Sequence, residues 1–360
     1  MIKQVQIRHF KGLSEFEVSA LARVTLLGGR NNVGKTSFLE ALFLYFDRHN
    51  ADALLRQYAW RNVPFVSLNP DAMWAPMFSK YDMEKAIEIV VKDEKKHTAN
   101  LKLQLNRDYV SRVRSGIPAL HGMPAKIDTQ AKPTPSLSLD VVYQLDKQSP
   151  QISHHVIGQQ GISLEIENMS VNSEKAVFLA ATGRVATQED AVRFGQLDVV
   201  GKLQEVVHFL KETVEPRLVG LSAVAVGDQT FIHAQLEGLE RKIPVAFMGD
   251  GMGRLLSVIL VMMTTRDGCV FIDEIENGIH YSALPKVWAG IVKAAKQFNC
   301  QVFATTHSYE CLQAAVQGLP EDLQNEFCYV RLERLDGRIE GKTYSHGVLG
   351  AALERNWEVR

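Results

Sequence analysis

One short glycine-rich segment constrains the fold of this 360-residue chain more than any other feature. Residues 29–36 read Gly-Arg-Asn-Asn-Val-Gly-Lys-Thr, which fits the pattern G-x-x-x-x-G-K-[ST] of a phosphate-binding loop. The aliphatic run Val24–Leu27 precedes this loop, and from Thr36 onward apolar residues recur at helical spacing. A strand, a glycine turn and a helix in this order predict an α/β fold built around a bound phosphate.

Each residue type in the loop suits an anion. Successive backbone N–H groups can surround a phosphate, glycines permit positive φ angles and close approach, and the following helix adds the positive end of its dipole. We expect Lys35 to reach the β- and γ-phosphates and the Thr36 hydroxyl to ligate Mg²⁺. The predicted phosphate-binding residues are Gly29, Arg30, Asn31, Asn32, Val33, Gly34, Lys35, Thr36 and Ser37.

Two later apolar strands end in residues suited to phosphate chemistry. The first, Cys269–Ile272, runs into Asp273 and Glu274, whose side chains should point to opposite faces because they are adjacent at the end of a strand. We therefore predict that Asp273 holds Mg²⁺ and that Glu274 is the general base for in-line attack of water on the γ-phosphate. The second strand leads to His307, and the intervening residues suffice for one helix and one strand. His307 is therefore expected beside the acids, as a γ-phosphate contact.

A second glycine cluster lies just before the apolar helical run Leu255–Met263. Residues 248–254 read Met-Gly-Asp-Gly-Met-Gly-Arg. Because an exposed helix N-terminus preceded by glycines can bind an anion, Gly249, Asp250 and Gly251 are further candidate binding residues. Taken alone, this segment would be only a loop.

Composition limits the class of protein and its location. Lys and Arg number 40 against 41 Asp and Glu, so any DNA contact must come from a local patch. The four cysteines contain no C-x-x-C pair and fit neither a disulfide framework nor a thiolate zinc site. The N-terminus lacks the apolar stretch of a secretory signal, and no apolar run approaches the roughly 20 residues of a membrane-spanning helix. We expect a cytoplasmic protein without a membrane partner.

An antiparallel β lobe is expected between about residues 85 and 170. Its predicted strands are Ala86–Val91, Ala99–Leu105, Leu139–Leu145 and Ile162–Ile166. The stretch 111–136 is rich in proline and glycine and lacks periodicity, which predicts a mobile surface loop. Its excess of basic residues is typical of a solvated loop and, less often, of a contact with a phosphate backbone.

A parallel sheet covered by helices is expected in the remainder. The apolar stripe between residues 190 and 215, ended by Pro216, predicts a helical arm that is either packed in the core or paired with a second copy. Strands near 218–236 should follow. The next predicted elements alternate, which implies parallel strands: a helix from Gly253, strand Cys269–Ile272, helix Leu284–Phe298 and strand Gln301–Ala304. A final hairpin over Phe327–Tyr344 should turn at Asp336 and Gly337.

Taken together and in this order, the two glycine-rich segments, the paired acids and the histidine resemble the ATP-binding-cassette (ABC) ATPases. The similarity narrows to the soluble heads of the SMC and RecF type, and further to the ATPase of OLD-like (overcoming lysogenization defect) proteins. The narrower resemblance rests on residues 273–280 (Asp-Glu-Ile-Glu-Asn-Gly-Ile-His), on Thr305–Ser308 and on the terminal residues 357–360 (Trp-Glu-Val-Arg). It implies a P-loop NTPase with an ABC-type head, formed by residues 1–180 and 218–360, and a helical arm for dimerisation over residues 181–217.

The resemblance also implies a dimer that sandwiches two ATP molecules with Mg²⁺. Gly249, Asp250 and Gly251 would form the signature that caps the γ-phosphate of the other subunit, with His280 near the dimer seam. Gly249 stands where the family signature has serine, and the missing hydroxyl affects the expected hydrolysis rate more than binding. Gln188 is a candidate for the glutamine that joins the β lobe to Mg²⁺.

Three functions fit these features. The first is an ATPase acting as a switch or sensor, in a homodimer or higher even oligomer, within a prokaryotic anti-phage defence or toxin-like system. No acidic cluster typical of a TOPRIM nuclease follows His307, so such an effector would be a separate protein. The second is a RecF-like repair ATPase that clamps DNA, and the third is an ATP-dependent scaffold without hydrolysis. The near-neutral charge favours the first hypothesis.

Overall fold

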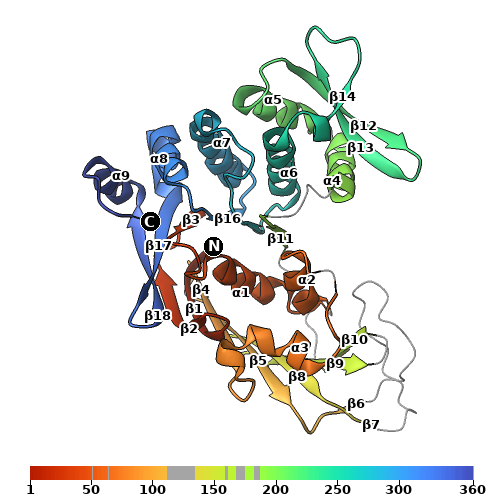
Figure 1. The fold of residues 1–360 in the computed structure, drawn as a ribbon, viewed down its shortest axis with the longest axis vertical. Coiled ribbons are helices and arrows are strands. Elements are labelled where there is room, and N and C mark those ends of the chain that lie inside the picture. Colours follow the sequence, from red (N-terminus) through yellow and green to blue (C-terminus); the bar gives the residue numbers. More distant parts are fainter. Residues whose placement is uncertain are drawn as a thin grey trace. The chain divides into compact units, whose positions relative to one another are not determined.

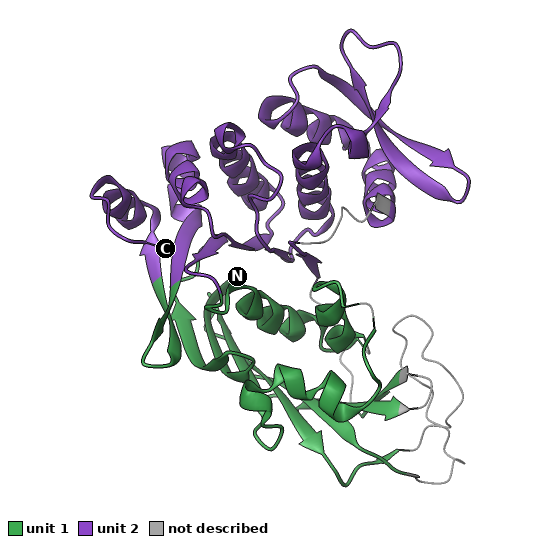
Figure 2. Cartoon of the chain, in the orientation of Figure 1, with its two compact units in different colours: residues 1–21, 32–174, 332–342 green, residues 22–31, 175–331, 343–360 purple. Residues whose placement is uncertain are grey.

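The computed structural model describes residues 1–50, 52–63, 65–111, 134–158, 161–167, 175–181 and 187–359. The chain divides into two compact units, shown in Figure 2. Unit 1 contains residues 1–21, 32–174 and 332–342, and unit 2 contains residues 22–31, 175–331 and 343–360. The sequence-based division at residues 180 and 217 follows the layout of a family and stays a prediction.

Unit 1 is built on an antiparallel sheet with the strand order β10-β9-β8-β5-β4-β1-β2 (Figure 1). The strands are β1 (Ile2–Phe10), β2 (Leu13–Ser19), β4 (Ile87–Asp93), β5 (Thr98–Asn106), β8 (Ser138–Leu145), β9 (Gln151–Gly158) and β10 (Gly161–Ile166). Alternation gives the sheet one buried face: Val5 and Ile7 of β1 are fully buried, whereas Gln4 and Gln6 are partly exposed. The predicted antiparallel lobe is confirmed, with β9 as an additional strand.

Most of the predicted surface loop, residues 112–133, lies outside the described residues. The two ends of that stretch were expected to be loop but form short strands. β6 (Val110–Ser111) pairs antiparallel with β7 (Thr134–Pro135). The Glu165 carboxylate of β10 accepts hydrogen bonds from the hydroxyls of Tyr109, at 2.7 Å, and Ser111, at 2.6 Å, which holds the segment leading into β6.

The helices of unit 1 are α1 (Lys35–Asp47), α2 (Ala53–Ala59) and α3 (Pro70–Met73). The predicted helix after the glycine loop is α1, which packs on β1 and β4. Its Glu40 is fully buried and is paired with Lys11, at 2.7 Å, and with Arg61. Burial lowers the pKa of Lys11 to about 8, although the Glu40 charge opposes this shift. This ion cluster ties α1 to the β1–β2 turn and to the residues after α2.

Unit 2 is built on a mostly parallel sheet with the order β11-β15-β16-β3-β17-β18, in which residues 332–342 of the β17–β18 hairpin are assigned to unit 1. The strands are β3 (Val24–Gly28), β11 (Ala176–Leu179), β15 (Cys269–Ile272), β16 (Gln301–Thr305), β17 (Phe327–Leu335) and β18 (Arg338–Ser345). All pairs from β11 to β17 are parallel. The α/β class, the alternating strands and helices, and the final hairpin are therefore confirmed.

Four helices accompany this sheet: α6 (Asp250–Thr264), α7 (Leu284–Gln297), α8 (Tyr309–Gly318) and α9 (His346–Glu354). Their apolar faces share one core with β3, β15 and β16. All four cysteines are buried and none forms a disulfide, and burial raises the pKa of Cys300 to about 11 and of Cys311 to about 12. The thiols of Cys300 and Cys311 therefore remain protonated at neutral pH and contribute to packing. Across the described part of the chain, no helix combines the length and hydropathy needed to cross a membrane.

The predicted helical arm is not one continuous helix. Two helices, α4 (Thr187–Val199) and α5 (Leu203–Thr213), are separated by a turn in which Gly201 has a φ of 68°. The periodicity continues across the break because most of the stripe is buried in the core of unit 2, including Leu197, Val206 and Leu210. The three-stranded sheet β12 (Leu218–Val226), β13 (Gln229–Leu236) and β14 (Ile243–Pro244) follows, as expected near residues 218–236.

Candidate functional site

The parallel strands of unit 2 bring the candidate residues to one edge. Leu179 of β11 pairs with Ile272 of β15, and Thr305 of β16 pairs with Leu27 of β3. Asp273 and Gly29 come directly after β15 and β3, and His307 comes two residues after the end of β16, so all three lie at the carboxyl edge of the sheet. Open α/β sheets bind their ligands at this edge.

The glycine-rich loop has the backbone of an anion-binding turn. Gly29, Asn32 and Gly34 have φ angles of 136°, 62° and 87°, so left-handed residues recur through the loop. Gly34 caps α1, and its carbonyl accepts the first helical hydrogen bond from Phe38 at 2.9 Å. A Cβ on Gly28 would collide with the ring of Tyr329, so only glycine fits where β3 enters the loop.

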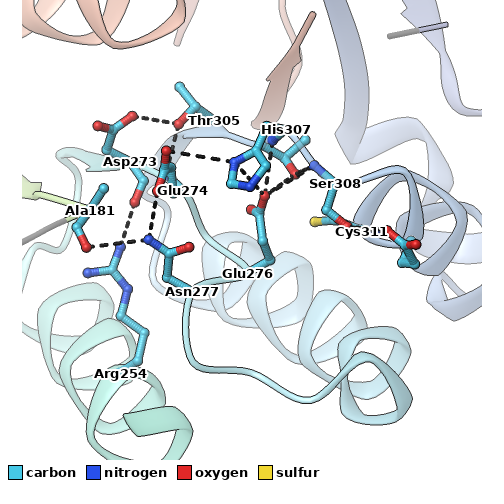
Figure 3. Close-up of polar contacts among 12 residues, drawn as sticks. Ala181, Arg254, Asp273, Glu274, Glu276, Asn277, Thr305, His307, Ser308 and Cys311 are labelled. Atoms are coloured by element: carbon cyan, nitrogen blue, oxygen red, sulfur yellow. Dashed lines mark hydrogen bonds and ion pairs between the residues drawn. The ribbon is translucent and has the colours of Figure 1, made fainter. Parts of the chain in front are cut away.

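The paired acids lie on a turn rather than on a continuing strand. β15 ends at Ile272, and Glu274 has a φ of 49°. The explanation by strand alternation is therefore wrong, because the two acids are not on a strand. Thr305 provides the link instead, because its hydroxyl donates to Asp273 Oδ1 at 2.6 Å and accepts from the Glu274 N–H at 2.8 Å. The two carboxylates point in different directions, as Figure 3 shows.

Glu274 faces the histidine predicted from the sequence. Its Oε1 lies 3.7 Å from Nδ1 of His307, and its Oε2 accepts a hydrogen bond from the Asn277 amide at 2.8 Å. The side chains of Glu274 and His307 are 39% and 49% exposed, so both can be reached by solvent. An accessible carboxylate with one oxygen fixed has the geometry required of a base that orients water.

Glu276 is a residue that the sequence reasoning did not assign to the site. Its Oε1 accepts from the Thr306 hydroxyl at 2.7 Å and from the backbone N–H groups of His307 and Ser308 at 3.0 and 3.2 Å. The same oxygen lies 3.4 Å from His307 Nδ1. One carboxylate thus fixes the turn that carries the histidine. The sequence shows Glu276 as an acid within the run 273–280, but the residues it binds, 306–308, follow a different strand.

Removing the Glu276 carboxylate should destabilise unit 2. We expect Glu276→Ala to lower the free energy of unfolding by about 2–3 kcal/mol, because the donors of residues 306–308 lose a largely buried acceptor. Glu276→Gln keeps an oxygen at that place and should lose less than half as much. Chemical denaturation of both variants measures the difference, and equal losses would contradict the role of the acceptor.

Arg254 is a second residue whose place was not predicted. It is buried on α6, and its guanidinium donates to the carbonyls of Ala180, at 2.9 Å, and Asp273, at 2.7 Å. Burial lowers its pKa, while the charges of Asp273, Glu274 and Glu276 oppose this shift. Arg254 therefore joins the ends of β11 and β15 beneath the acids. In the sequence, this role is indicated by the position of Arg254 as a charged residue directly before the apolar run 255–263.

The second glycine cluster packs directly against the residues after the acids. The helix α6 begins at Asp250, three residues earlier than predicted, with Gly249 as its N-cap at a φ of 92°. A Cβ on Gly251 would lie 2.5 Å from the carbonyl oxygen of Gly278, which itself has a φ of 74°. This close backbone contact joins the start of α6 to the loop that carries Asn277. His280 lies two residues beyond Gly278 and caps the following 3₁₀ turn at Ser282.

The structure therefore gathers some of the predicted site residues within unit 2 and places others in unit 1. Asp273, Glu274 and His307 are gathered at the sheet edge of unit 2, with Gly29 to Asn31 following the neighbouring strand. Asn32 to Ser37 belong to unit 1 and form the end of the loop and the first turn of α1. Gln188 lies on α4, where its side chain accepts from the Thr230 N–H at 3.5 Å.

A glycine-rich loop at one strand end, with carboxylates and an imidazole at neighbouring strand ends, defines the class of P-loop nucleoside triphosphatases. The chain belongs to the AAA ATPase domain family, whose model matches residues 1–181. The prediction of an ATP-hydrolysing enzyme is confirmed by this membership. A second model, described as "AAA domain, putative AbiEii toxin, Type IV TA system", matches residues 148–312.

Individual proteins are similar over most of the chain. An ATP/GTP phosphatase of Helicobacter pylori is 23% identical over 372 residues, which cover 96% of this chain and 95% of the relative. An uncharacterised protein of Methanocaldococcus jannaschii, MJECL10, is 20% identical and covers 65% of this chain and 95% of its own length. The SMC head domain from Thermotoga maritima is 12% identical, with a TM-score of 0.47, and the match covers 96% of this chain and 99% of that one.

Proposed function

We propose that the chain is a Mg²⁺-dependent ATPase in which Asp273, Glu274 and His307 act on a triphosphate held by residues 29–37. The observation that carries this proposal is the hydrogen-bonded arrangement of Asp273, Thr305, Glu274 and His307 at one sheet edge. It combines a carboxylate for a metal, a base for water and an imidazole for the terminal phosphate.

The residues present fit a magnesium ion. Asp273 is buried, and the Thr305 hydroxyl directs its Oδ1, while Thr36 supplies a hydroxyl at the start of α1. Carboxylate and hydroxyl oxygens are hard donors, and Mg²⁺ usually takes one or two protein ligands together with phosphate oxygens and water. When bound, Mg²⁺ neutralises charge on the β- and γ-phosphate oxygens.

The roles of Lys35 and the loop follow from the phosphate-loop motif, and those of Glu274 and His307 follow from their contacts. Lys35 binds the terminal phosphates, and backbone N–H groups of the loop hold the β-phosphate. Glu274 orients a water and accepts its proton as the water attacks in line, while Asn277 fixes the second carboxylate oxygen. His307 donates a hydrogen bond to the γ-phosphate from the turn that Glu276 holds.

Two copies complete each site in this proposal. Gly249, Asp250 and Gly251 at the N-terminus of α6 face the γ-phosphate held by the other copy, as the ABC-type resemblance implies. Gly249 supplies an N–H but no hydroxyl, so binding depends on the backbone and the helix dipole. The nucleotide then stabilises the dimer, and hydrolysis releases it.

We further propose that this cycle is a switch for a separate effector in a prokaryotic defence or toxin-like system in the cytoplasm. The match of residues 148–312 to the AbiEii and type IV TA model supports this setting, as does the OLD-like run 273–280. A TOPRIM-type nuclease is the effector that the resemblance suggests.

Phosphate release from the purified chain tests the enzymatic part. We expect release from ATP with Mg²⁺ and none above background with EDTA, because the charge on the γ-phosphate must be neutralised before attack. GTP should be compared, since the Helicobacter pylori relative is named an ATP/GTP phosphatase. Binding of Mg²⁺-ATP without release of phosphate would instead favour the scaffold hypothesis.

The proposed effector needs a separate experiment. Pull-down of the neighbouring gene product, with and without ATP, tests whether the chain binds it.

A further inference from the structure

Exposed apolar side chains are concentrated between the start of α4 and the start of α6. Of the seventeen large hydrophobic residues exposed in the described part of the chain, eight fall within the 61 residues 187–247. They are Val192, Val199, Val200, Val219, Val224, Val226, Leu239 and Phe247. Three of them, Val219, Val224 and Val226, lie on one strand, β12.

The strand β12 is the open edge of the sheet in this segment. It pairs with β13 on one side, and the described residues provide no strand for its other side. Its nine residues, Leu-Val-Gly-Leu-Ser-Ala-Val-Ala-Val, include neither a charged residue nor a proline. Proteins usually protect an exposed edge with lysine, proline or irregularity. In β12 the pairing with β13 shifts register between Leu218 and Gly220, and from Gly220 to Val226 the pairing is regular.

The strand leaves the core along its length. Leu221 stands opposite the buried Ala234 of β13 and packs on the core of unit 2, whereas Ala223, two residues further along the same face, is exposed. Val224 stands opposite Phe231 on the other face and is 37% exposed, and Val226 on the same face is 58% exposed. The hairpin of β12 and β13 extends beyond α4 of its own unit (Figure 2). Its edge is therefore open to a further strand.

We propose that residues 220–226 of β12 pair with the same residues of a second copy, antiparallel about a twofold axis through Ala223. In this register each large residue meets a small one: Val226 meets Gly220, Leu221 meets Ala225, and Val224 meets Ser222. No like charges oppose each other along the strand. The two three-stranded sheets thereby join into one sheet of six strands.

The proposed partner is a second copy because the side-chain sizes along β12 are complementary to those of the same strand in antiparallel orientation. The centre of the segment is Ala223, and residue size is complementary on either side of it. A twofold interface uses the same patch on both subunits, as this register does. The contact requires no nucleotide, so it is independent of the ATP-dependent dimer proposed above. It would keep two copies together while nucleotide is absent.

Sedimentation equilibrium of the nucleotide-free full chain tests this pairing. We expect a dimer for the wild type. For Val224→Lys/Val226→Lys the dissociation constant of the dimer should rise by about tenfold or more, equivalent to about 1.4 kcal/mol, because like charges then converge about the axis. The variant Val224→Glu/Val226→Glu should dissociate similarly. An equimolar mixture of the two variants should recover the dimer, and this recovery also establishes that both are folded.

The matched control is Val348→Lys on α9, since Val348 is 54% exposed and lies away from β12 in the sequence. It should leave the dimer unchanged, as should Lys35→Ala, which removes the phosphate-binding amine. A monomeric nucleotide-free wild type, or a dimer that persists in the double lysine variant, would overturn the proposal. Both outcomes concern the oligomeric state and not phosphate release, so the pairing of β12 can fail while the proposed ATPase activity stands.

Discussion

Glu274→Gln is expected to lower the rate of ATP hydrolysis by about 10²- to 10⁴-fold, the range of a general base in a positioned site. The amide can still accept a hydrogen bond but cannot take a proton from water. Nucleotide binding depends on other residues and should persist, so the ATP-bound dimer should accumulate. Single-turnover phosphate release and size-exclusion chromatography with ATP measure the two effects.

The control for this prediction is Glu321→Gln, which makes the same change at an exposed acid in the turn before β17. That variant should hydrolyse ATP at the wild-type rate. Unchanged phosphate release in Glu274→Gln would remove Glu274 from its proposed role. It would leave binding by the glycine loop intact as a separate conclusion.

Lys35→Ala is expected to weaken ATP binding by about 30- to 700-fold, or about 2–4 kcal/mol, because two charge-assisted hydrogen bonds to phosphate oxygens are lost. The backbone N–H groups of the loop remain and account for residual affinity. Isothermal titration with Mg²⁺-ATP gives the dissociation constant directly. Hydrolysis should fall as well, since the terminal phosphate is no longer held.

Lys286→Ala removes the same amine from an exposed position on α7 and should not change ATP affinity. Equal affinities of wild type and Lys35→Ala would show that residues 29–37 do not hold the nucleotide. Thermal melting of both variants without nucleotide should agree, because Lys35 is at the helix start and outside the apolar core.

The elements closest to the site could be predicted well from the sequence. β3, β15 and β16 are short apolar runs bounded by polar turns, and a fully buried parallel strand gives that pattern. The glycine loop is fixed by the backbone conformations it must adopt, so its residue types carry strong information. The convergence of Asp273, Glu274 and His307 then follows from the parallel order of the strands.

Contacts between separate strands could not be predicted in the same way. Glu276 holds residues 306–308, and Arg254 joins the ends of β11 and β15, but neither partner is near in sequence. The positive φ of Glu274 was also missed, because a glutamate carries no local signal for that conformation. Strand alternation was therefore applied one residue too far.

The break between α4 and α5 could not be predicted from apolar periodicity. A buried stripe keeps its helical period across a short turn, so periodicity alone suggested one element. Gly201 and the two helix ends mark the turn, but a single glycine is tolerated inside many helices. β9 was missed because its two histidines, His154 and His155, interrupt the apolar pattern of the strand.

The contact between Gly251 and Gly278 has a mechanical consequence. Two main chains that touch without side chains between them cannot absorb a displacement by changing rotamers. A movement at the first turn of α6 must therefore be transmitted to the residues that hold Asn277, whose amide restrains Glu274. A molecule that displaces the start of α6 would therefore displace Asn277 and, through the Asn277 amide, the carboxylate of Glu274.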